Sequence, residues 1–332
     1  MNLELSFTIL IFLQINFNFI FFINFKKISS LINIFDYPNV RKKHDHPVPL
    51  IGGTLIACNF IFITLYLYFF NSSNIEFDII FFIFGYISFF FLGLYDDKLY
   101  LNAYLKLLIS ILILLPIVFF DSNVQLTILK FSFIDNYLSL NNFSIFITIL
   151  FFLLFINAFN MFDGINCQNG LYSIVLVLVL LFSSNKNFFL YGLLMSLIIF
   201  TYFNFKNKFF LGDSGTLSLS FLFSYLFIMY YNKQYIIFSD QVYLYMFLPG
   251  LELMRLYLFR LVKKRNPFKP DRNHLHHFFL DHYGYNKTII AILSFIIIPI
   301  LLSYFVETLI LNILSLLIYL YFIFFRFKGS FK

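Results

Sequence analysis

Apolar runs of close to twenty residues recur along the whole chain and constrain its fold more than any other feature. Of the 332 residues, 61% are hydrophobic and only 12% are charged. A soluble domain could not bury so much apolar surface, whereas a run of about 20 apolar residues matches the thickness of a hydrocarbon core. The sequence therefore predicts an all-α integral membrane protein. Because no long polar stretch separates the runs, we expect residues 1–332 to form a single transmembrane domain.

A helix placed on each apolar run gives a polytopic bundle of about 10–11 membrane-spanning helices. The expected spans are residues 3–25, 51–70, 78–95, 103–120, 143–159, 168–183, 188–205, 214–231, 241–261, 288–305 and 308–325. The first run is preceded by no basic n-region and is longer than the apolar core of a signal peptide, so we expect it to be retained as a helix.

The basic residues are divided unequally between the two sets of loops that these spans define. One set holds most of the 23 Lys and Arg residues, whereas the other holds only Lys130, Lys186 and Lys233. Cytoplasmic loops carry the excess of Lys and Arg in membrane proteins. The pattern predicts a multi-pass membrane protein whose N-terminus lies outside and whose C-terminus lies inside.

Four short polar segments interrupt the apolar sequence, and all four fall on the predicted cytoplasmic side. They are LGLYDDKLYLNAYLKL around Asp96 and Asp97, NAFNMFDGIN around Asp163, FLGDSG around Asp213, and NPFKPDRNHLHH around His274. A charged group costs roughly 2.5–3.5 kcal/mol at the centre of a membrane helix, so carboxylates and histidines retained at helix ends indicate function. We expect cytoplasmic active-site loops. The structural alternatives are a solvated helix end for the Asp96–Asp97 pair and an ordinary N-cap for Asp213.

These segments, together with DYPNVRKKHDHPVPLIGG (residues 36–53), resemble in order the motifs of the polyprenyl-phosphate N-acetylhexosamine 1-phosphate transferases, glycosyl transferase family 4. PDRNHLHH is closer to the undecaprenyl-phosphate N-acetylglucosamine 1-phosphate transferase branch than to the phospho-muramoyl-pentapeptide transferases. The resemblance implies a phosphotransferase of the bacterial inner membrane. It would transfer N-acetylhexosamine 1-phosphate from a UDP-sugar to polyprenyl (undecaprenyl) phosphate. The products would be a polyprenyl-diphosphate-sugar and UMP, as the first step of a cell-envelope glycan such as lipopolysaccharide or wall teichoic acid.

Two anionic substrates must meet in such a reaction, so a divalent cation and basic side chains are needed to offset their repulsion. Mg²⁺ prefers oxygen ligands, which Asp213 and either Asp96 or Asp97 could supply. The resemblance points to Asp213 as the metal ligand, and we pair it with Asp97. The expected cofactor is Mg²⁺, with Mn²⁺ as the substitute. Asp96, Asp97, Asp163 and His276 are the expected catalytic residues.

Amide and basic side chains complete the expected site. The residues assigned to substrate binding are His44, Lys106, Asn157, Asn160, Asn166, Arg272, His274 and His277. Arg geometry suits a diphosphate, and the resemblance assigns the histidine segment to pyrophosphate binding. The role of Glu252 stays open, with pairing to Arg255 or Arg260 as the simplest interpretation.

Several alternatives remain at the level of sequence. Because a phosphate monoester has a second pKa near ~6, we favour direct in-line attack by the lipid phosphate over a covalent aspartyl-phosphate. A transporter is the competing class, since carboxylates and histidines also build ion relays. The expected partners are the UDP-sugar, the polyprenyl phosphate and the bilayer, with no nucleic acid. A homodimer is one arrangement that the sequence leaves open.

Overall fold

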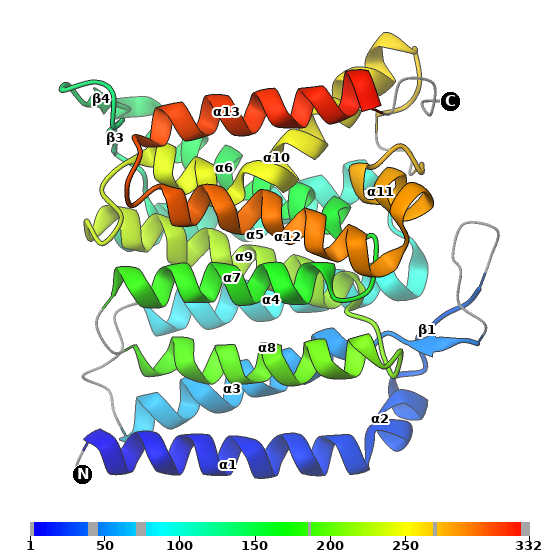
Figure 1. Ribbon diagram of the computed structural model, residues 1–332. Coiled ribbons are helices and arrows are strands. Elements are labelled where there is room, and N and C mark those ends of the chain that lie inside the picture. Colours follow the sequence, from blue (N-terminus) through cyan, green and yellow to red (C-terminus); the bar gives the residue numbers. More distant parts are fainter. Residues whose placement is uncertain (1–2, 39–45, 71–77, 185–186, 268–270, 327–332) are drawn as a thin grey trace.

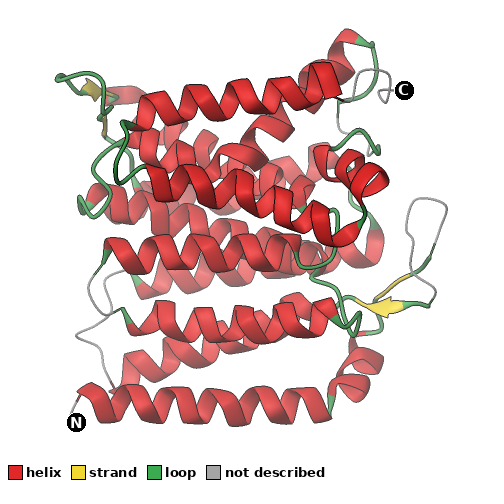
Figure 2. Cartoon of the chain, in the orientation of Figure 1, coloured by secondary structure: helices red, strands yellow, loops and turns green. Residues whose placement is uncertain are grey.

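The computed structural model describes residues 3–38, 46–70, 78–184, 187–267 and 271–326. The described residues are mostly helical, and the only strands among them are two short antiparallel pairs (Figure 2). The helices are α1 (Leu3–Ile23), α2 (Phe25–Ile32), α3 (Gly52–Phe70), α4 (Ile79–Leu99), α5 (Ala103–Phe120), α6 (Ser144–Phe162), α7 (Gln168–Ser183), α8 (Phe188–Phe205), α9 (Gly212–Asn232), α10 (Ser239–Val262), α11 (Leu275–Tyr283), α12 (Tyr285–Leu302) and α13 (Thr308–Tyr321). The predicted all-α membrane fold is confirmed.

Each of the eleven predicted spans corresponds to one helix, with boundaries that differ by a few residues. Within the described ranges, nine helices are long and apolar enough to cross a membrane, while α7 and α13 are apolar but shorter. Two short helices, α2 and α11, were not predicted. Both lie at the ends of spans, where the apolar pattern is too short to define a helix.

Helix α9 lies in the centre of the bundle, between α4, α6 and α3. Its residues from Ser214 to Tyr231 are all buried, although α9 is among the least apolar of the candidate spans. Small and hydroxylated side chains allow neighbouring helices to approach closely. The Ser218 hydroxyl, for example, donates to the Ser214 carbonyl at 2.7 Å, so it is satisfied within the helix.

Polar side chains within the first apolar runs form a buried cluster between α1, α3 and α8. Asn18 and Asn59 exchange two hydrogen bonds of 2.9 Å. The Gln14 amide donates to the Asn59 side chain at 3.1 Å and to the Gly192 carbonyl at 2.7 Å. Hydrogen bonds of this kind join helices inside a bilayer. These amides therefore have a structural role that their scattered positions in the sequence did not indicate.

The two ends of the bundle differ (Figure 1). One end carries α2, α11 and the strand pair β1 (Phe35–Asp36) with β2 (Val48–Pro49), and we refer to it as the α11 end. The other carries the strand pair β3 (Ile128–Leu129) with β4 (Leu138–Ser139), and we refer to it as the β3–β4 end. Helix α1 begins at the β3–β4 end and α13 finishes at the α11 end, as an odd number of crossings requires.

Candidate active site

Asp97 joins the end of α4 to the start of α9. Its Oδ1 accepts the backbone N–H of Asp213 at 2.8 Å, and its Oδ2 accepts that of Ser214 at 3.0 Å. The first N–H groups of a helix lack partners within the helix, and a carboxylate satisfies them and complements the helix dipole. Asp97 therefore caps α9 from a neighbouring helix, a role that sequence reasoning did not identify.

Two glycines permit this close approach. A Cβ atom on Gly93 would lie 2.2 Å from the Asp213 carbonyl oxygen. Gly212 has a positive φ of +73°, and a Cβ there would lie 2.7 Å from the Asp97 Oδ2. A side chain at either position would separate α4 from α9. The close contact with Asp97 therefore explains the glycine at position 212. The sequence did not indicate that Gly93 has a similar role.

Lys106, near the start of α5, connects two of the predicted carboxylates. Its ammonium forms an ion pair with Asp96 and lies 3.2 Å from Asp213 Oδ2. The Asp96 side chain is only 7% exposed and also accepts the Leu101 N–H at 2.7 Å, whereas the Asp213 side chain is 34% exposed. The structure thus brings Asp96, Asp97, Lys106 and Asp213 together in one cluster, in which Asp213 is more open to a ligand than Asp96.

The Asp163 segment and the histidine segment meet at Gly164. Asp163 is the C-cap of α6 and is exposed. A Cβ on Gly164 would lie only 1.8 Å from Nε2 of His276, so the buried imidazole packs directly on this glycine. One turn earlier, Asn160 accepts a hydrogen bond of 3.2 Å from Thr216 on α9. These contacts link the carboxylate cluster, the Asp163 turn and the histidines at the α11 end.

Three histidine rings pack against one another at the start of α11. The ring centroids of His274 and His276 are 5.0 Å apart and nearly parallel, and those of His276 and His277 are 4.3 Å apart. Burial lowers the pKa of His276 well below its usual value, and the neighbouring His277 and His274 lower it further. Burial also lowers the pKa of His274, although Glu252 opposes the change. Both changes in pKa favour the neutral forms of these two imidazoles.

Buried polar atoms without a protein partner indicate where a ligand could bind. Among the described residues, His276 Nε2 and both amide atoms of Gln168 have no hydrogen-bond partner. Leaving a buried polar group unpaired costs about 1–3 kcal/mol, so each is a candidate to contact substrate. Gln168 opens α7 after the Asp163 turn and is only 2% exposed. No sequence signal distinguished it.

Other predicted residues lie at the same end but use their side chains locally. The Asn157 amide donates to the Leu153 carbonyl of its own helix at 2.7 Å. Asn166 donates to the side chain of Asn207 and so connects the Asp163 turn to the loop between α8 and α9. Arg272 forms a 3.2 Å ion pair with Asp281. His44 lies outside the described residues.

The donor chemistry of the carboxylate cluster fits a magnesium ion. Within the described part of the chain, no three His, Cys, Asp or Glu side chains form a preassembled metal site. Mg²⁺ needs no such cage, because it is usually held by one or two carboxylates, waters and substrate phosphates. The ammonium of Lys106 already brings carboxylate oxygens of Asp96 and Asp213 around one positive charge. The residues present therefore suit the expected cation.

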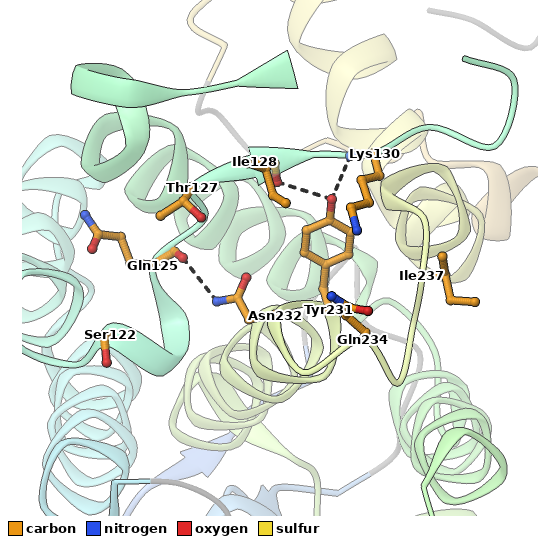
Figure 3. Close-up of a pocket in the computed structure, with 9 residues that line it drawn as sticks. All are labelled: Ser122, Gln125, Thr127, Ile128, Lys130, Tyr231, Asn232, Gln234 and Ile237. Carbon is orange, nitrogen blue, oxygen red and sulfur yellow. Dashed lines mark hydrogen bonds between the residues drawn. The ribbon is translucent and has the colours of Figure 1, made fainter. Parts of the chain in front are cut away.

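A pocket of about 210 Å³ lies at the opposite, β3–β4 end (Figure 3). The Tyr231 hydroxyl fixes one wall, because it accepts the Lys130 N–H at 2.7 Å and donates to the Ile128 carbonyl at 3.2 Å. Among the described residues that line it, Lys130 is the only charged one, and there is no Asp, Glu or His. The pocket lacks the groups for phosphate and metal chemistry, so the candidate site is at the α11 end.

Comparison with known proteins shows the family of the chain. The model of glycosyl transferase family 4 matches residues 79–231, which include Asp96, Asp97, Lys106, Asp163 and Asp213. A Thermotoga maritima protein named undecaprenyl-phosphate alpha-N-acetylglucosaminyl 1-phosphate transferase is 30% identical, over 81% of this chain and 82% of its own length.

More distant relatives carry the same or a closely similar name. An Escherichia coli O157:H7 protein of that name is 25% identical, over 78% of this chain and 72% of its own. A Bacillus subtilis protein, named a probable undecaprenyl-phosphate N-acetylglucosaminyl 1-phosphate transferase, is 25% identical, over 76% of this chain and 71% of its own. The fold and site define a multi-pass membrane transferase. The chain belongs to glycosyl transferase family 4, and the resemblance inferred from its motifs is confirmed.

Proposed function

We propose that this protein transfers N-acetylglucosamine 1-phosphate from UDP-N-acetylglucosamine to undecaprenyl phosphate, with UMP as the second product. The observation that carries the proposal is the cluster of Asp96, Asp97, Lys106 and Asp213 at one end of a membrane bundle. Carboxylate oxygens around a cation suit phosphate chemistry. Because the cluster lies at helix ends, a lipid from the bilayer and a nucleotide from water could both reach it. Relatives named for this reaction support the same assignment.

The reaction balances as a single displacement at phosphorus. An oxygen of the lipid phosphate attacks the phosphorus that carries the sugar, and the bond from that phosphorus to the bridging oxygen of the diphosphate breaks. The bridging oxygen leaves with its electron pair as part of UMP. The lipid phosphate is largely dianionic at neutral pH and needs little help from a base, so no covalent enzyme intermediate is required.

The carboxylate cluster would hold the metal and the charge balance around the phosphates. Asp213 is the principal candidate ligand because its side chain is more exposed than that of Asp96, and both oxygens of Asp97 already accept N–H groups of α9. Asp97 would bind the metal only through the oxygen lone pairs that remain after it has accepted two backbone N–H groups. A bound Mg²⁺, or Mn²⁺ in its place, would neutralise diphosphate oxygens. Asp96 keeps Lys106 beside Asp213, where the ammonium can also meet a phosphate.

The neighbouring groups would bind and orient the donor. Neutral His276 can donate or accept a hydrogen bond at its buried and unpartnered Nε2, and Arg272, four residues earlier, supplies a positive charge that is paired with Asp281. Asn160 and Asp163, at the end of α6, would contact the nucleotide-sugar, with Asn157 and Asn166 shaping the pocket. His44, His274 and His277 would complete the phosphate contacts. The position of the described residues at the α11 end supports these roles, and the role of His44 rests on the motif resemblance alone.

The distribution of basic residues supports an inner-membrane protein with its active site facing the cytoplasm. The α11 end would then meet cytoplasmic UDP-sugar, and the β3–β4 end would face outside. The acceptor would enter laterally from the bilayer. A homodimer is compatible with this arrangement, since the site is assembled within one chain.

The test is to reconstitute the full-length protein in vesicles with undecaprenyl phosphate and UDP-N-acetylglucosamine labelled at the sugar-linked phosphate. We expect that phosphate label to enter the lipid fraction in a one-to-one ratio with released UMP. Release of UDP, with the phosphate label left in water, would instead indicate ordinary glycosyl transfer and contradict the proposal. The same assay with other UDP-N-acetylhexosamines identifies the preferred sugar.

A further inference from the structure

A buried carboxylate on α10 contacts the histidine segment directly. Glu252 is 3% exposed, and its Oε2 accepts the backbone N–H of Leu275 at 3.0 Å. The same oxygen lies 3.9 Å from His274 Nδ1. Leu275 is the first residue of α11, and the N-cap residue His274 makes no side-chain cap of its own. Glu252 therefore caps α11 from a different helix.

Arg255, one turn further along α10, holds the other side of His274. Its guanidinium binds Glu252 through both Nε and Nη2, at 3.2 and 3.0 Å. Nη2 also donates to the Asn273 carbonyl at 2.6 Å. The two peptide groups that flank His274 are thus each held by one member of the Glu252–Arg255 pair. The pair is charge-balanced, so it adds no net negative charge next to the expected diphosphate.

Tyr319 brings α13 into the same network. Its hydroxyl donates to Glu252 Oε1 and accepts the Arg255 Nε–H at 2.7 Å, and its side chain is almost fully buried. A hydroxyl that bridges both members of an ion pair restricts how they can rotate. Through Glu252 and Arg255, Tyr319 therefore connects α13 to the histidine segment.

We infer that Glu252, Arg255 and Tyr319 are positioning residues that set His274 and His276 for binding the diphosphate of the donor. The inference rests on the proposed function, because it assigns the histidines to the donor. None of the three needs to touch substrate. They act by fixing the first turn of α11, which holds His276 against Gly164 with His274 stacked on it.

Tyr319→Phe tests the inference with little risk to folding, since it removes one hydroxyl and keeps the ion pair. The matched control is Tyr231→Phe, which also removes a hydroxyl with two polar partners, but at the β3–β4 end (Figure 3). We expect Tyr319→Phe to raise KM for the UDP-sugar about tenfold, with KM for undecaprenyl phosphate nearly unchanged. Tyr231→Phe should leave both values as in the wild type. Equal donor KM values for the two variants would overturn the inference.

A double-mutant cycle separates positioning from general destabilisation. In a His276→Ala background, Tyr319→Phe should cause little further increase in donor KM, because the ring that it helps to place is gone. Fully additive effects would show that Tyr319 does not act through His276 and would contradict the inference.

Hydrogen exchange provides a readout that does not depend on activity. The peptide that contains Leu275 should exchange faster in Tyr319→Phe than in the wild type or in Tyr231→Phe, because its N–H is bonded to Glu252. Unchanged exchange would contradict the positioning role even if the wild-type protein did not release UMP. An inactive wild type would count against the proposed function alone.

Discussion

Two central helices begin with an aspartate at the same position, and the two aspartates lie at opposite ends of the bundle. Asp213 is the second residue of α9 at the α11 end, and Asp240 is the second residue of α10 at the β3–β4 end. Asp240 is 6% exposed and accepts the Ser132 N–H at 2.8 Å and the Ser132 hydroxyl at 2.6 Å. The Asp213 side chain is 34% exposed and holds Lys106 through one oxygen.

The difference separates a carboxylate used to fix structure from one available for chemistry. At Asp240 both oxygens are occupied by a loop, and the charge serves the start of a helix. At the start of α9, Asp97 accepts the backbone N–H groups of Asp213 and Ser214, and the Asp213 carboxylate itself faces Lys106 and is partly exposed. An acidic first turn in the sequence is common to both ends. Asp213 is a candidate metal ligand, and Asp240 is not, because Asp97 of α4 caps the helix that carries Asp213.

Apart from the aspartate variants, we expect the largest loss of activity from substitution of Lys106, with Lys130 at the other end as the comparison. Lys106→Met would leave Asp96 and Asp213 without their shared cation, and breaking a buried pair is strongly unfavourable. We expect UMP release to fall about 10²-fold, together with a lower melting temperature. Lys130→Met, in the pocket at the β3–β4 end, should retain most of the activity. Similar losses in both variants would show that the two ends are not functionally distinct.

A glycine substitution tests the contact between the Asp163 turn and the histidines. In Gly164→Ala the new Cβ would meet His276 Nε2 at 1.8 Å, so the buried ring must move. We expect UMP release to fall about tenfold while the protein remains folded in detergent. Gly250→Ala is the control, because no described atom lies within 4 Å of a Cβ at that position. Wild-type activity in Gly164→Ala would show that the placement of His276 is unimportant.

The smallest expected effect is on the pH dependence of stability. The pKa of His276 is lowered well below its usual value near 6.5, so the folded protein keeps this imidazole neutral. Below about pH 6.5 the unfolded chain binds a proton that the folded chain does not, and stability falls as pH falls, by at most about 1.4 kcal/mol per unit for one group. The melting temperature of His276→Gln should therefore decrease less than that of the wild type between pH 7 and pH 5. Parallel curves would mean that His276 titrates normally.

The helices of the bundle could be predicted from the sequence because each depends on one continuous apolar run. Backbone groups inside a membrane must form hydrogen bonds within their own segment, so each long apolar run predicts a helix. This rule located all eleven apolar helices, nine long and two shorter, among the described residues. The short helices α2 and α11 were not predicted because their apolar pattern is too short to define a helix. The buried position of α9 was also not apparent, since its Ser-rich sequence is less apolar than the helices that surround it.

The sequence predicted which residues gather at the site, but not the contacts that hold them together. Motif spacing indicated Asp96, Asp97, Asp163, Asp213 and the histidines, and the structure brings them to one end. Sequence alone could not show that the Asp97 oxygens bind the backbone of α9, because the two segments are more than a hundred residues apart. The same holds for Glu252, whose pairing with Arg255 was foreseen while its bond to Leu275 was not.

The central claim is that the chemistry belongs to Asp213 and not to its counterpart Asp240. The most direct test measures UMP release by purified Asp213→Asn and Asp240→Asn across a Mg²⁺ titration, with the wild type alongside. Because the metal is expected to supply several kcal/mol of transition-state stabilisation, Asp213→Asn should lose at least ~10²-fold in rate and change its Mg²⁺ dependence. Asp240→Asn should retain the wild-type Mg²⁺ dependence and most of the rate. An Asp213→Asn protein with wild-type rate and unchanged metal dependence would contradict the account.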